Sequence, residues 1–239
     1  MLAVAAVLVG VAKTAINGVA SIAVVIFAAV LPARESTGAI LPLLLCGDVI
    51  AVTWYRRHAD WSTLWRLLPG VLPGLLLGAW FVSAVDDALM RRTIAVILLV
   101  MCALQARQLV RSSGTSSGTP PRPHGLVTVG TGATAGFATM TANAAGPITT
   151  IYLIRAGLPM VQMIGTGAWF YLIVNLAKVP FSAGLGLITP TSLARDALLL
   201  PALILGAVSG ILLVRRLRQR QFELIALGFS AATALLLLL

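Results

Sequence analysis

The sequence has few charged residues, two histidines and two cysteines. Only 10% of its 239 residues are charged, whereas about 25% is usual in soluble domains. His58 and His124 lie far apart without the spacing of metal ligands, and we find neither a nucleophile–His–acid set nor a phosphate-binding loop. Cys46 and Cys102 both lie in apolar stretches, which favours small buried residues over a disulfide. The sequence therefore predicts no enzyme, no metal site and no cofactor.

Hydrophobic residues, in contrast, make up 59% of the chain, and the mean hydropathy is +1.00. Several apolar runs reach about 20 residues, the length of helix that crosses a bilayer. The net charge of +10 comes from arginines that gather between these runs, as in cytoplasmic loops of membrane proteins, so it does not indicate a nucleic-acid partner. We expect an all-α integral membrane protein, a polytopic helical bundle in contact with the lipid bilayer. Its apolar segments lie at about 2–31, 36–54, 64–84, 90–106, 125–154, 160–180, 196–214 and 222–239.

A stretch rich in Ser, Gly and Pro divides the chain near its middle. Residues 111–123 have the composition of a flexible linker. They separate a first membrane repeat, 1–110, from a second, 124–239. This division predicts two membrane halves of similar size.

The two halves resemble each other. Gly and Pro positions recur at a sequence offset that drifts from 126 to 132 residues. A pair of polar residues inside apolar segments also recurs, because Asn17 and Asp48 in the first half match Asn143 and Asn175 in the second. We interpret this pattern as an internal duplication, which is common in secondary transporters.

The first segment of each half is about 30 residues long and is interrupted near its middle, at 13–18 and at 139–147. Pro147 cannot continue a helix without losing a hydrogen bond. Each segment is either one long kinked helix or a re-entrant hairpin of two half-helices. If every segment simply spans, the basic residues divide eight against eight between the two sides; with hairpins they divide eleven against five. The positive-inside rule therefore favours hairpins and two inverted halves, with the basic side in the cytoplasm.

The few polar residues at membrane depth cluster at these interruptions and on the segment after each. Lys13 is the only charged residue of its apolar run, and a lone ammonium there indicates a functional site. Half-helix N-termini favour anions, and Lys13 adds a full positive charge. We therefore expect a small anion with Lys13 as its main partner. The candidate substrate-binding residues are Lys13, Thr14, Asn17, Thr139, Thr141, Asn143 and Asn175.

Asp48 is the only acidic residue well inside an apolar segment. Two interpretations of it stay open. Asp48 either pairs with Lys13 and holds two helices together, or carries a proton in coupled transport. For Lys178 two interpretations also stay open: it is either a further polar residue at membrane depth or, since Pro180 follows closely, a helix-end residue that extends to the membrane interface.

Six motifs are spread over nearly the whole chain: Gly10-Val-Ala-Lys-Thr14 and the stretches 41–48, 55–61, 139–147, 165–170 and 175–180. Together they resemble the TauE/SafE family of sulfite exporters. The resemblance implies a secondary transporter of sulfite, sulfonates or related organic anions that works by alternating access in the bacterial inner membrane. A passive anion channel and a non-transporting membrane scaffold are the alternatives, and homo-oligomerisation is left open.

Overall fold

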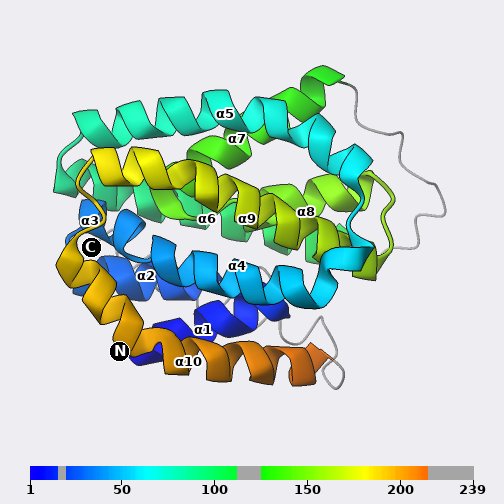
Figure 1. The fold of residues 1–239 in the computed structure, drawn as a ribbon. Helices are drawn as coiled ribbons and strands as arrows, with labels where there is room; N and C mark the ends of the chain where they lie inside the picture. Colours follow the sequence, from blue (N-terminus) through cyan, green and yellow to red (C-terminus); the bar gives the residue numbers. More distant parts are fainter. Residues whose placement is uncertain (16–19, 112–124, 215–239) are drawn as a thin grey trace.

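A computed structural model describes residues 1–15, 20–111 and 125–214 (Figure 1). Within these ranges every regular element is a helix, as the sequence predicts. Asn17, nearly all of the predicted linker and the predicted segment 222–239 lie outside the described residues. The helices are α1 (Leu2–Thr14), α2 (Ala20–Val30), α3 (Ala33–Ala39), α4 (Leu41–Tyr55), the 3₁₀ turn η2 (Arg56–His58), α5 (Trp61–Ala84), α6 (Asp87–Arg111), α7 (Gly125–Ala142), α8 (Gly146–Arg155), α9 (Met160–Gly184) and α10 (Pro190–Val214).

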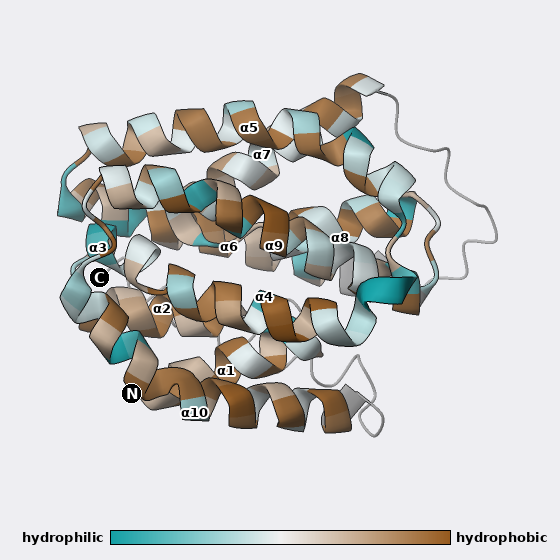
Figure 2. Ribbon diagram, in the orientation of Figure 1, coloured by the Kyte–Doolittle hydropathy of each residue, from teal (hydrophilic) through white to brown (hydrophobic). Residues whose placement is uncertain are grey.

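Among the residues that the structure describes, three helical stretches are long and apolar enough to cross a membrane: Ala33–His58, Trp61–Ala84 and Pro190–Leu212. Figure 2 shows hydrophobic residues along much of α5 and α10, while the η2 turn is hydrophilic. Large apolar side chains such as Trp80 and Leu205 are 69% exposed, which suits contact with lipid and not with water. These helices support the predicted membrane protein.

Both long first segments are broken where the sequence predicts. Helix α1 ends at Thr14 and α2 begins at Ala20, while α7 ends at Ala142 and α8 begins at Gly146. Pro147 lies in the first turn of α8, where its missing N–H costs no helical hydrogen bond. At this break Asn143 adopts a φ of 49°, a left-handed conformation that asparagine tolerates better than most residues.

In each broken segment the second half-helix turns back along the first. Helices α1 and α2 lie side by side, and so do α7 and α8. In Figure 1, α1 starts near the N label and runs to the right, whereas α7 starts at the upper right and runs to the left. Each of these segments is therefore two separate, adjacent helices in the described residues and not one continuous helix.

The most extensive contacts between helices join α5 to α7, α1 to α10 and α4 to α9. Glycines let the first two pairs approach closely. A Cβ atom on Gly74 would lie 2.1 Å from the Ala133 carbonyl oxygen, and one on Gly206 would lie 2.1 Å from that of Val7. Gly74 and Gly206 are 132 residues apart and Val7 and Ala133 are 126 apart, which are the offsets found in the sequence. Residues at matching positions therefore make matching contacts.

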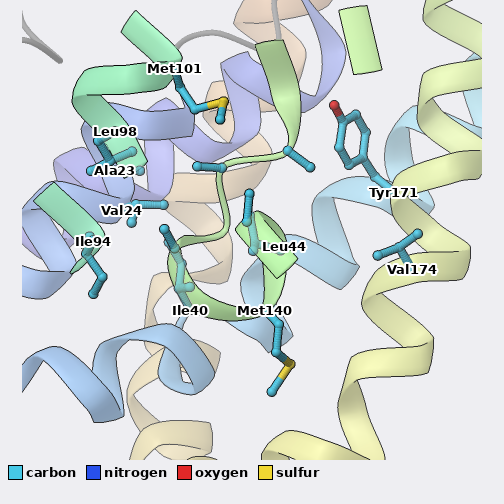
Figure 3. Close-up of a cluster of buried hydrophobic side chains, with 14 of the residues drawn as sticks. Ala23, Val24, Ile40, Leu44, Ile94, Leu98, Met101, Met140, Tyr171 and Val174 are labelled. Carbon is cyan, nitrogen blue, oxygen red and sulfur yellow. The ribbon is translucent and has the colours of Figure 1, made fainter. Parts of the chain in front are cut away.

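An apolar core surrounds the middle of the bundle (Figure 3). It brings together buried side chains of α2, of the α3–α4 region, of α6, of α7 and of α9. Tyr171 and Val174 of α9 lie at one side of this cluster, and Met101 of α6 lies at another. The core thus includes Ala144 and Ala145, which lie at the break between α7 and α8.

Candidate functional site

A buried ion pair joins the first hairpin to α4. Lys13 Nζ lies 2.6 Å from Asp48 Oδ1, and the two side chains are 8% and 0% exposed. The other carboxylate oxygen of Asp48 accepts a hydrogen bond of 2.6 Å from Asn175 Nδ2 of α9. The pairing of Lys13 with Asp48, one of the two interpretations left open by the sequence, is thus present. Asp48 and Asn175, which occupy matching positions in the two halves, contact each other directly.

Tyr171 of α9 borders the same lysine. Lys13 Nζ lies 4.7 Å from the centroid of the Tyr171 ring, within the range of a cation–π contact. The Tyr171 hydroxyl shares a hydrogen bond with the Thr149 hydroxyl of α8. The sequence analysis missed Tyr171 and Thr149. For Tyr171 the reason is that an aromatic residue in an apolar segment is usually a packing residue. The spacing of Tyr171 four residues before Asn175, on the same helical face, is the signal that indicates it.

Lys178 is the second buried lysine, and the interpretation that places it at the membrane interface is wrong. Its side chain is fully buried. Its ammonium group donates to the Thr139 carbonyl oxygen at 2.8 Å and to Asn143 Oδ1. The reason for the error is that α9 continues through Pro180 to Gly184, so Lys178 does not lie at a helix end. Lys178 is therefore no longer counted among the five basic residues on the less basic side of the hairpin arrangement.

Asn143 fixes the junction between α7 and α8. Its Nδ2 donates a 3.0 Å hydrogen bond to the Thr37 carbonyl oxygen of α3, while its Oδ1 accepts from Lys178. The side chain is thus held from both ends, which supports the left-handed backbone at this position. The first turn of α8 is positioned as a result.

Thr14 and Thr141 are held in backbone contacts. The Thr14 hydroxyl donates to the carbonyl oxygens of Gly10 and Ala207, at 3.0 Å each, and so joins α1 to α10. The Thr141 hydroxyl donates to the Phe137 carbonyl oxygen at 2.8 Å. Neither side chain is brought to the cavity described next, whereas Lys13, Thr139, Asn143 and Asn175 all are.

A small cavity of about 40 Å³ lies beside the two breaks. A water molecule needs about 10–15 Å³ by this measure, so the cavity holds a few waters or a small oxyanion. Ala20 at the start of α2 and Gly146 at the start of α8 both line it. No side chain caps the α8 N-terminus at Ala145, so backbone N–H groups there stay available for an anion. Its polar lining residues are Lys13, Gln105, Thr139, Asn143, Tyr171 and Asn175.

Membrane-length helices around a buried cluster of polar and charged side chains define a helical membrane protein. The model of one family, described as sulfite exporter TauE/SafE, matches residues 2–237. The chain therefore belongs to the sulfite exporter TauE/SafE family, a family of membrane transporters. No curated protein and no solved structure matches the chain.

Proposed function

We propose that the protein is a secondary transporter of small anions, with sulfite, sulfonates and related organic anions as its substrate class, in the bacterial inner membrane. The observation that carries the proposal is the cavity between the two hairpins. Lys13 lines it, and so do the first residues of α2 and α8. A full positive charge and two helix N-termini at one small cavity favour an anion. The family description supports sulfite as the first anion to test.

Transport would proceed by alternating access between two inverted halves, 1–110 and 124–239. Two further close contacts support this arrangement, since a Cβ atom on Gly10 would lie 2.2 Å from the Leu203 carbonyl oxygen and one on Gly136 would lie 2.3 Å from that of Val71. The two glycines, 126 residues apart, again contact residues 132 apart. The opposite directions of α1 and α7 agree with inversion (Figure 1). In such transporters one half moves against the other around a central site.

The basic ends of the helices give the orientation. The α4–α5 connection, which carries Arg56 and Arg57, lies at the right of Figure 1 with the end of α8, which carries Arg155. The α5–α6 turn lies at the opposite end. By the positive-inside rule the end with Arg56, Arg57 and Arg155 is cytoplasmic.

Lys13 would be the main partner of the anion while it stays paired with Asp48. An ammonium group has three donor hydrogens, and Lys13 lines the cavity while it pairs with Asp48. A proton on the Asp48 carboxylate would weaken this pair and raise the net charge at the site by one, which would couple anion movement to a proton. Two side chains contact the Asp48 carboxylate: Lys13 of α1 pairs with one oxygen, and Asn175 of α9 donates a hydrogen bond to the other.

Flux measurements in proteoliposomes test this proposal. Purified protein is reconstituted and offered sulfite, thiosulfate, sulfonates and carboxylates under an imposed proton gradient. Accumulation of one of these anions against its own gradient is the expected result. Equilibration without accumulation would indicate a passive channel, and the absence of flux for the whole panel would argue for a scaffold.

A further inference from the structure

The two lysines of the chain both lie in one buried polar cluster. Its members are Lys13, Asp48, Thr139, Asn143, Asn175 and Lys178. Lys13 pairs with Asp48, whereas Lys178 contacts only uncharged oxygen atoms in its two hydrogen bonds, a backbone carbonyl and an amide. With both lysines and Asp48 ionised, the described residues of the cluster carry one positive charge in excess. A buried charge without a counter-ion is costly. The cluster therefore lacks one negative charge.

Lys178 is placed to act on the cavity through its charge. The two oxygen atoms that accept its hydrogen bonds belong to Thr139 and Asn143, which both line the cavity. Lys178 itself does not line it. Its charge also interacts with those of Lys13 and Asp48. In a poorly hydrated environment such interactions extend over several ångströms. An anion in the cavity would feel Lys178 without touching it.

The helical packing alone does not require a lysine at this position. Residue 51 matches Lys178 at the offset of 127 that relates Asp48 to Asn175, and it is alanine. Ala51 of α4 is 1% exposed, so a small apolar residue is buried at the corresponding place in the first half. The lysine is thus a feature of the second half only.

We propose, on the basis of the function proposed above, that Lys178 supplies the charge that a bound anion neutralises, so that the site selects ligands with a single negative charge. Lys13 provides the direct contact and Asp48 cancels its charge. Lys178 remains as the uncompensated charge. Among small sulfur oxyanions, a monoanion such as methanesulfonate then binds better than a dianion such as sulfate.

Binding to the wild-type protein gives the first test. Methanesulfonate and sulfate compete with radiolabelled sulfite for the purified full-length protein at neutral pH. We expect methanesulfonate to bind at least about tenfold more tightly than sulfate. Equal binding, or a preference for sulfate, would overturn the inference. If neither these anions nor sulfite binds, the proposed anion transport is itself refuted.

Variants separate the charge of Lys178 from its hydrogen bonds. Lys178→Met lowers the net charge of the cluster from +1 to 0, and Lys178→Met combined with Asp48→Asn returns it to +1. We expect methanesulfonate affinity to fall about tenfold or more in the single variant and to recover to within about threefold of wild type in the double variant. Both variants lose the same hydrogen bonds to Thr139 and Asn143, while the double variant also loses the Lys13–Asp48 ion pair, so Asp48→Asn alone is measured beside them as the reference for that loss.

The control is Arg91→Met, which removes a positive charge at a side chain that is 46% exposed, and it should leave the affinity unchanged. Folding of each variant is checked by gel filtration and thermal melting in detergent. A folded double variant that stays as weak as the single one would show that Lys178 acts by holding Asn143 and Thr139, which contradicts the inference. If Lys178→Met does not fold, the wild-type competition decides.

Discussion

The double variant Lys13→Met with Asp48→Asn distinguishes an anion-binding lysine from a structural ion pair. Lys13→Met alone leaves the Asp48 carboxylate buried without its cation, since Asp48 is 0% exposed. Breaking a buried pair by removing one partner costs about 3–5 kcal/mol. Asp48→Asn removes that charge, and the new amide oxygen can still accept the hydrogen bond from Asn175 Nδ2. We therefore expect the double variant to recover most of the stability lost in the single one.

Transport should not recover with stability. The lost contact between Lys13 and the anion is a charge-assisted hydrogen bond, with a contribution of about 1.5–3 kcal/mol, which corresponds to roughly tenfold to hundredfold in affinity. Lys178 cannot replace this contact, because it does not line the cavity. Thermal melting in detergent measures the stability, and tracer flux of sulfite in proteoliposomes measures the transport. A double variant with wild-type flux would refute the reasoning, since Lys13 would then serve only to neutralise Asp48.

The remaining predictions concern coupling, packing and topology. Asp48→Asn should make anion flux independent of an imposed proton gradient, whereas an unchanged response would remove Asp48 from coupling. Gly74→Ala should lower the stability by about 1–3 kcal/mol, because the new Cβ would lie 2.1 Å from a backbone oxygen. Gly130→Ala on α7, with no atom within 4 Å of its Cβ position, should be tolerated. Equal melting temperatures of the two variants would contradict the close α5–α7 packing. In a background with Cys46 and Cys102 replaced by alanine, Arg57→Cys should react with an impermeant thiol reagent added on the cytoplasmic side. Asp86→Cys should react with the reagent added on the other side. Reaction of both cysteines from the same side would exclude the proposed orientation.

The helix breaks and the ion pair could be predicted because polar residues are rare in this sequence. A lone lysine and a lone aspartate in apolar segments have few alternative partners, and Lys13 and Asp48 meet as one interpretation expected. Gly146 and Pro147 similarly mark the start of α8, since proline interrupts a helix but suits its first turn. Local chemistry was sufficient at these positions.

The role of Lys178 could not be predicted from the sequence in the same way. Its burial depends on α9 continuing through Pro180, which the neighbouring helices decide and the local sequence does not. The contact of Tyr171 with Lys13 also depends on how α1 and α9 lie in space. Tertiary packing, and not residue type, determines both positions.

The most direct test of the central claim compares sulfite flux through wild-type protein and Lys13→Ala in proteoliposomes with equal amounts of inserted protein. The account predicts accumulation of sulfite against its gradient by the wild type and no flux above empty vesicles for Lys13→Ala. Flux through Lys13→Ala at the wild-type rate would contradict the claim that Lys13 binds the transported anion.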